Sequence, residues 1–170
     1  MESSLTQIYQ TLQKLIGFHR QLLETVRMEH EALVQADIRK IEDAVFAKQA
    51  LIEAIQRAEV ERMKALSELA MAWKKPVSEL TLNNIVIIIQ GQDIKFAEQF
   101  RSSLNALNLL IKRVSEQNKG NSVLVDKSLE NIHAMKKNVL GESAPRTDVY
   151  NQKGCRSTGQ PSSRLISKEV

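Results

Sequence analysis

Apolar residues recur every three or four positions along the first part of the chain, a spacing typical of amphipathic α-helices. They are Leu5, Ile8, Leu12, Leu15, Leu22, Val26 and Leu33, with His19 and Glu29 at the remaining positions of the stripe. The pattern predicts a helix that begins after Ser3 or Ser4 and ends near Gln35. Because His19 lies in the stripe, we interpret it as a packed side chain rather than as a base.

A second helix is predicted from Asp37 to about Lys74. The stripe changes phase at Asp37, whose side chain suits a helix N-cap, and Pro76 disfavours helical conformation at the residue before it. The apolar positions are Ile38, Ile41, Val45, Ile52, Ile55, Leu66, Leu69 and Trp73, mixed with Lys48, Glu59 and Arg62. Two long helices joined by a turn at residues 35–37 are expected to pack antiparallel.

The segment from Glu79 to Gln90 is crowded with isoleucine and valine. A β-strand would suit these β-branched residues, but no second strand is available for pairing, so we predict a short helix with Ser78 as a candidate cap. A long helix then begins near Asp93 and continues to about residue 140. Its seam steps by three and four through Ala97, Phe100, Leu104, Leu107, Ile111, Val114, Asn118, Asn121, Val125, Ser128, Ile132, Met135 and Val139.

The middle of this last helix is polar, with Gly120 between Asn118 and Asn121. Polar residues in a seam can fix its register, which is the interpretation we favour, or the position can act as a hinge. Five leucines lie outside the seam, namely Leu109, Leu110, Leu124, Leu129 and Leu140. A second apolar flank has to be covered by another helix or by a partner.

From this excess we predict a partner-binding surface at the end of the last helix. Its residues are Leu124, Leu129, Ile132, Met135 and Leu140. Ile132 also fits the seam, so its burial inside the protein is the alternative.

Composition separates a folded part from a tail. Aromatic residues make up only 4% of the chain, and the abundance of Leu, Ile, Ala, Glu, Gln and Lys is typical of long helices. Glycine, proline and serine gather in the last 30 residues. The predicted fold is therefore all-α: an antiparallel hairpin of long helices, a short helix and a long C-terminal helix over residues 1–140, followed by a flexible, disordered tail over residues 141–170.

Charge and apolar runs argue against nucleic-acid and membrane partners. The formal net charge is +4, but basic and acidic residues alternate along the chain without a run of one sign. The longest apolar run, Ile85 to Ile89, is too short to span a bilayer. The N-terminus lacks the features of a signal peptide and Cys155 has no second cysteine to pair with, so we expect a reducing, cytoplasmic location.

The sequence offers no arrangement of residues for catalysis. The three histidines are spread over two predicted helices: His19 and His30 lie in the first helix and His133 lies in the last. No metal-binding, nucleophile or phosphate-binding motif is present. We therefore expect a binding protein without a cofactor or metal rather than an enzyme.

Two groups of residues form a series of motifs along the chain. The first, in the predicted hairpin, is Glu31-Ala32-Leu33, Asp37, Lys48, Leu51-Ile52, Glu59 and Arg62. The second and more specific group is Asn118-Lys119-Gly120-Asn121, Leu124, Ser128-Leu129 and Ile132, followed by Tyr150-Asn151-Gln152-Lys153-Gly154. Together they resemble the FlgN-type flagellar export chaperones. The resemblance covers about residues 1–155, and the order of the motifs is more specific than any one of them.

The resemblance implies a function. Members of this family keep the hook-associated proteins, which form the hook–filament junction, soluble and competent for export in the cytoplasm, and pass them to the flagellar type III export gate. It implies that Tyr150 and Gly154 belong to the segment that docks on the cytoplasmic domain of the gate. From the residues alone, Tyr150 could instead fold back onto the helices, and the whole chain could be a coiled-coil scaffold that forms a constitutive homo-oligomer.

Overall fold

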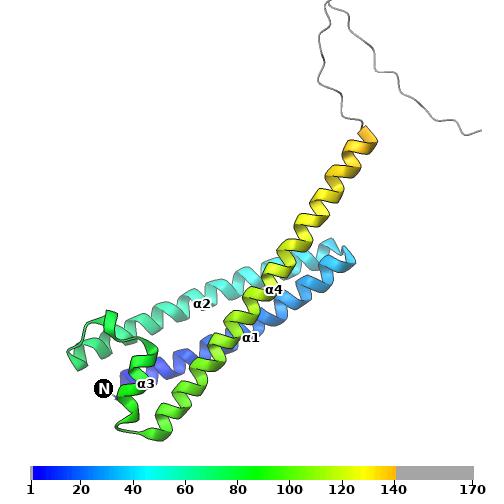
Figure 1. Cartoon of the computed structure of the whole chain (residues 1–170). Helices are drawn as coiled ribbons and strands as arrows, with labels where there is room; N and C mark the ends of the chain where they lie inside the picture. Colours follow the sequence, from blue (N-terminus) through cyan, green and yellow to red (C-terminus); the bar gives the residue numbers. More distant parts are fainter. Residues whose placement is uncertain (1, 141–170) are drawn as a thin grey trace, which may run out of the picture. The chain divides into compact units, whose positions relative to one another are not determined.

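All regular structure in the described part of the chain is helical. The structure is a computed structural model that describes residues 2–140 (Figure 1). The elements are α1 (Glu2–Gln35), α2 (Ile38–Trp73), a 3-10 turn η1 (Val77–Glu79), α3 (Leu82–Gln90) and α4 (Ile94–Leu140), with no β-strand among the described residues. The predicted all-α class and the order of its helices are confirmed.

The chain divides into two compact units, residues 1–129 and residues 130–170. The first unit contains α1, α2, η1, α3 and most of α4. In the second unit, residues 130–140 form the last turns of α4, and the predicted tail over residues 141–170 lies outside the described residues. The proposed division into a domain over 1–140 and a tail stays a prediction.

The hairpin turn is built by residues 36 and 37. Ala36 has a left-handed backbone with φ of 53°, which ends α1, and the N–H of Asp37 donates to the Ala32 carbonyl at 3.0 Å. Asp37 then starts α2, because its Oδ1 accepts from the backbone N–H of Lys40 at 3.2 Å. The predicted N-cap and the antiparallel hairpin of α1 and α2 are confirmed (Figure 1).

The connection between α2 and α3 differs from the prediction in one detail. Ser78, the candidate cap, lies inside the 3-10 turn that follows Pro76. Thr81 is extended and caps α3 instead, accepting from the Asn84 N–H at 3.2 Å. The prediction of Ser78 was wrong because the chain after Pro76 makes a turn of its own before α3 begins.

The apolar core of residues 1–129 is densest near the N-terminal end of α1. Ile8, Leu12 and Leu15 of α1 are fully buried there, together with Leu69 of α2 and Phe100 of α4. The β-branched segment joins this core as helix α3, with Ile85, Val86 and Ile89 buried and Ile87 exposed. Burial of one helical face thus outweighs the local strand propensity of the segment.

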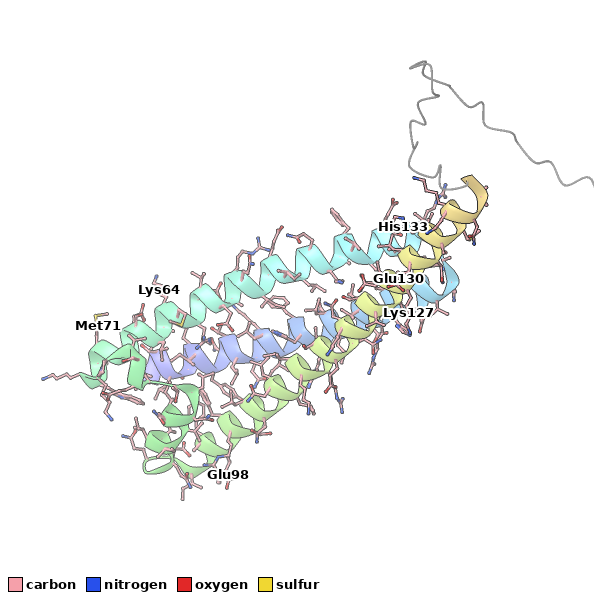
Figure 2. The ribbon with its side chains drawn as sticks, turned by 45° about the horizontal axis from the view of Figure 1, so that its top comes forward. Lys64, Met71, Glu98, Lys127, Glu130 and His133 are labelled. Atoms are coloured by element: carbon pink, nitrogen blue, oxygen red, sulfur yellow. The ribbon has the colours of Figure 1, made fainter. Side chains whose placement is uncertain are left out.

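Helix α4 runs parallel to α1 within the first unit. The ring of Tyr9 lies 5.5 Å from that of Phe96, Gln13 Nε2 donates to Ser103 Oγ at 2.7 Å, and His30 contacts Asn121 at 2.9 Å. Residue numbers on both helices rise together along these contacts. Because α1 and α2 are antiparallel, α4 runs antiparallel to α2 (Figure 2).

The Asp37 cap makes one part of the stability depend on pH. The backbone N–H of Lys40 holds the pKa of Asp37 below its ordinary value, and the Lys40 ammonium, 3.3 Å from Oδ2, adds to the effect. A lowered folded pKa contributes stability that is present above the unfolded pKa, about 3.9, and is lost as the pH falls through the folded value.

We therefore expect Asp37→Asn, whose amide oxygen can still cap the helix, to melt below the wild type at pH 7. The difference should shrink steadily as the pH is lowered below about 4. Thermal melts of both proteins across this range measure it, with Asp126→Asn, at an exposed position of α4 outside any cap, as the control. A difference that does not change with pH would show that the charge of Asp37 is not what stabilises the turn.

Candidate functional site

The residues predicted to bind a partner lie on α4 and are largely solvent-exposed. Leu129 is 49% exposed, Ile132 58% and Met135 66%, while Leu124 is half-buried. Leu124 and Leu129 belong to the first unit, Ile132 and Met135 to the second. Leu140 ends α4, and its side chain lies outside the described residues. Ile132 is therefore not buried, so the alternative considered for it does not hold.

The seam of α4 turns gradually away from the positions that the sequence predicts. Ile111 and Val125, assigned to the seam, are 45% and 39% exposed, whereas their neighbours Leu110 and Leu124 are half-buried. An α-helix has 3.6 residues per turn, so a strict seven-residue repeat rotates by about 20° per heptad. This rotation corrects some of the seam positions beyond Leu107: Leu110 and Leu124 turn inward in place of Ile111 and Val125. The predicted seam residues Val114, which is half-buried, and Asn121, which is buried, keep their places.

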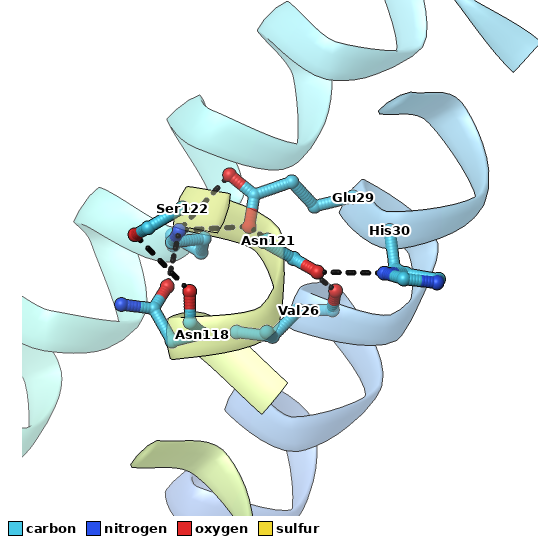
Figure 3. A network of polar contacts seen from close by, with 7 residues as sticks. Val26, Glu29, His30, Asn118, Asn121 and Ser122 are labelled. Carbon is cyan, nitrogen blue, oxygen red and sulfur yellow. Dashed lines mark hydrogen bonds and ion pairs between the residues drawn. The ribbon is translucent and has the colours of Figure 1, made fainter. Parts of the chain in front are cut away.

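A buried asparagine marks the point where α4 meets α1. Asn121 is 3% exposed, and its Nδ2 donates to the Val26 carbonyl and to Glu29 Oε2, both at 2.9 Å (Figure 3). Because both partners only accept, the amide orientation is fixed and Oδ1 is left as the acceptor. His30 Nδ1, 2.9 Å away, must therefore carry the proton that it donates to Oδ1.

Lys48 joins α2 to the same network. Its Nζ lies 3.0 and 2.9 Å from the two carboxylate oxygens of Glu29, and 3.1 Å from Asn118 Oδ1. The Glu29 and Lys48 side chains are 10% and 21% exposed. We call Glu29, His30, Lys48, Asn118 and Asn121 the polar knot, because together they link α1, α2 and α4 through side-chain hydrogen bonds.

The polar knot explains the polar middle of the α4 seam. A buried side chain with fixed partners tolerates only one alignment of its helix, which supports the register-fixing interpretation of Asn121, and α4 is helical on both sides of it. The sequence placed Glu29 and Lys48 in the two stripes. It could not show that they pair, because residues 19 positions apart in two helices meet only once the turn geometry is known.

No catalytic arrangement is found among residues 2–140. His19 Nδ1 donates to the Leu15 carbonyl of its own helix at 2.8 Å, and His133 is exposed on α4 (Figure 2). In the same range, no three His, Cys, Asp or Glu residues come close enough to hold a metal ion. The described part of the chain also contains no helix with an apolar stretch long enough to cross a bilayer.

One open cavity of about 450 Å³ lies near the hairpin turn, between α1 and α2. Ala32, Ala44 and Ala47 line it, and their short side chains leave the space unfilled. Lys40 and Asp43 lie at its edge, and Asp43 is exposed. Its polar groups do not converge on a point, so the cavity does not indicate a ligand.

The residues predicted to dock on an export gate, Tyr150 and Gly154, lie outside the described residues. What the structure describes is a bundle of long helices with outward-facing apolar residues on α4 and a polar knot that fixes how its helices align. These features define an all-helical protein that leaves apolar surface uncovered on α4.

Comparison with known families identifies the group to which it belongs. The family model described as FlgN protein matches residues 1–158. The chain belongs to this family of flagellar export chaperones, and the resemblance read from the sequence is confirmed. Searches of curated proteins and of solved structures found no match.

The polar knot can be tested by removing its central side chain. Asn121→Ala leaves buried acceptors on Glu29 and Val26 without their donor, so we expect the free energy of unfolding to fall by about 1–3 kcal/mol. Asn108→Ala, at an exposed position of the same helix outside the polar knot, is the matched control and should cost less than about 1 kcal/mol. Urea titrations of the three proteins measure both effects. Equal losses for the two variants would mean that Asn121 holds no special place in the fold.

Proposed function

We propose that the chain binds flagellar hook-associated proteins in the cytoplasm, prevents their premature assembly and delivers them to the flagellar type III export gate. The observation that carries this proposal is the row of exposed apolar side chains on α4, in a chain that belongs to a family of flagellar export chaperones. Leu129, Ile132 and Met135 follow one another at steps of three residues and are each about half exposed or more.

Exposed apolar side chains at helical spacing suit one kind of partner. An amphipathic helix can lay its apolar face on such a row, which removes the apolar surface of both proteins from water. Under this proposal, the client presents an amphipathic segment of this kind before it assembles. A chaperone that covers this segment would keep the client soluble, and a helical segment held in this way cannot pair prematurely with its assembly partners.

The second step, delivery to the gate, is proposed for the segment around Tyr150 and Gly154. The support is the resemblance of Tyr150-Asn151-Gln152-Lys153-Gly154 to the family motif. A tyrosine ring is apolar with a polar tip, which suits it to a pocket on a partner surface.

A pull-down with tagged protein from a bacterial lysate tests the proposal as a whole. Recovery of hook-associated proteins would support it. Recovery of the chain alone, as a stable homo-oligomer, would favour a coiled-coil scaffold instead, which the same exposed apolar residues could also build.

The α4 surface can be tested with Leu129→Ser combined with Leu140→Ser. We expect weaker binding of purified hook-associated proteins, by about tenfold, with little change in helicity, because Leu129 is 49% exposed. Val60→Ser, at a 70% exposed position of α2, is the control and should bind normally. Loss of helicity by circular dichroism would identify the two leucines as core residues.

The gate segment can be tested with Tyr150→Ala. The variant should bind hook-associated proteins and melt as the wild type does, but bind the cytoplasmic domain of the export gate more weakly, since the ring would supply the anchor. Titration of both proteins against that domain measures the difference. Equal affinities would remove Tyr150 from the docking segment, and a lowered melting temperature would indicate that its ring packs on the helices.

A further inference from the structure

The polar knot ends at the surface, where α2 and α4 meet. The three N–H groups of the Lys48 ammonium are all engaged, two by Glu29 and one by Asn118. Asn118 uses only its Oδ1 in this contact. Its Nδ2 takes no part in the polar knot, and the residue is exposed, so its N–H groups are accessible to an acceptor outside the chain.

Apolar side chains flank this point on both helices. On α2, Val45 lies three residues before Lys48 and Ile52 four residues after it, spacings that place them on the same side of the helix. On α4, Ile111 and Val125 lie seven residues before and after Asn118. All four are exposed although they are large and apolar, at 51%, 38%, 45% and 39% in the order given.

We call these four exposed residues, Val45, Ile52, Ile111 and Val125, the α2–α4 seam; this surface is distinct from the inward-facing seam of α4 described above. Lys48 and Asn118 are hydrogen-bonded to each other, so the side of α2 that carries Val45 and Ile52 lies beside the side of α4 that carries Ile111 and Val125. Both helices already pack on α1. The seam is therefore the line along which a further helix would contact α2 and α4 at once and complete a four-helix bundle.

The charges beside the seam favour a partner of a particular sign. Between Ile111 and Val125, the length of the α4 side of the seam, α4 carries three basic residues and one acidic residue. Lys112 and Lys119 are exposed and follow Ile111 and Asn118 by one position, which puts them at the solvent edge of the seam. Lys112 is held only by an exposed 3.9 Å ion pair with Glu116, which a better-placed carboxylate can replace.

We propose that the α2–α4 seam binds an amphipathic helix of the export client, with acidic residues along the edge that faces α4 and a hydrogen-bond acceptor at its centre. The inference rests on the proposed chaperone function and adds a surface to it, since α2 was given no part in client binding from the sequence. The acceptor on the client helix would accept a hydrogen bond from Asn118 Nδ2. Apolar side chains of the client helix would cover Val45 and Ile52 on α2, and Ile111 and Val125 on α4. Another copy of α4 fits less well, because it would bring like charges to Lys112 and Lys119.

The test compares seam variants with variants elsewhere on the same helices. Val45→Ser with Ile111→Ser removes one apolar side chain from each wall of the seam. Val60→Ser with Leu109→Ser removes one exposed apolar side chain from each of the same two helices: Val60 lies eight residues beyond Ile52 on α2, and Leu109 lies on the opposite side of α4 from Asn118. The probes are the purified hook-associated proteins of the same bacterium, titrated by calorimetry, with circular dichroism as the check on folding.

We expect the dissociation constant to rise about tenfold for the seam pair and to stay within about twofold for the control pair. Lys112→Glu with Lys119→Glu should also weaken binding, more at low than at high salt, whereas Lys64→Glu on α2 should not. A photoreactive amino acid at position 45 should cross-link to the client, and one at position 60 should not. This experiment tests whether the client contacts the seam while the other three seam residues stay unchanged.

The outcomes separate this inference from the function on which it rests. If hook-associated proteins bind the wild type and the seam and control variants equally well, the seam is not the site, while the proposed function stands. If no hook-associated protein binds the wild type, the proposed function fails and the inference fails with it. If the seam variants change self-association by light scattering but not client binding, the occupant is a second copy and the inference is overturned.

Discussion

The hydrogen bonds that Lys48 and Asn121 donate to the Glu29 carboxylate are the contacts on which the arrangement of the three long helices depends. Glu29 of α1 accepts hydrogen bonds from the Lys48 ammonium of α2 and from the Asn121 amide of α4, so it links α1 to both helices. Burying a carboxylate is costly unless its partners are close and well placed, and here every partner distance is 3.0 Å or less. A shift of either helix by one residue would leave the charge buried without its partner. Apolar contacts alone would penalise such a shift much less, so the polar knot determines the register more than the total stability.

The same alignment determines which apolar residues remain outside. With Asn121 fixed against Val26 and Glu29, the α-helical rotation carries Leu124 inward and Val125 outward. Lys48, drawn to Glu29 and Asn118, places Val45 and Ile52 beside it at the surface. The exposed apolar residues near the knot are thus a consequence of its geometry and not of a poorly packed core. A substitution in the knot is therefore expected to alter the binding surface as well as the fold.

The sequence predicted the helices well, because their ends depend on local chemistry. Asp37 caps α2 through its own side chain, and Pro76 limits the residue before it, so both ends can be read without knowing the neighbours. Ser78 and Thr81 could not be told apart, because both can cap a helix and only the turn after Pro76 decides between them. The seam of α4 was predicted correctly as far as Leu107 and again at Val114 and Asn121, but the rotation between a seven-residue repeat and the true helical period displaces Ile111 and Val125 outward. The pairing of Glu29, Lys48 and Asn121 and the exposure of Ile111 depend on how helices meet in space, which spacing along one chain does not contain.

The distribution of large and small buried residues indicates how one short chain can be both stable and open to a partner. Near the N-terminal end of α1 the bundle buries Ile8, Leu12 and Phe100 completely, and α3 closes that end with Ile85. Toward the hairpin turn the buried side chains of α1 and α2 include Ala32, Ala44 and Glu29, which bury much less apolar surface than leucine or phenylalanine would. Stability is therefore concentrated at one end of the hairpin. Under the proposed function, a client that covers the exposed apolar residues at the other end can bind and leave while the packed end stays folded.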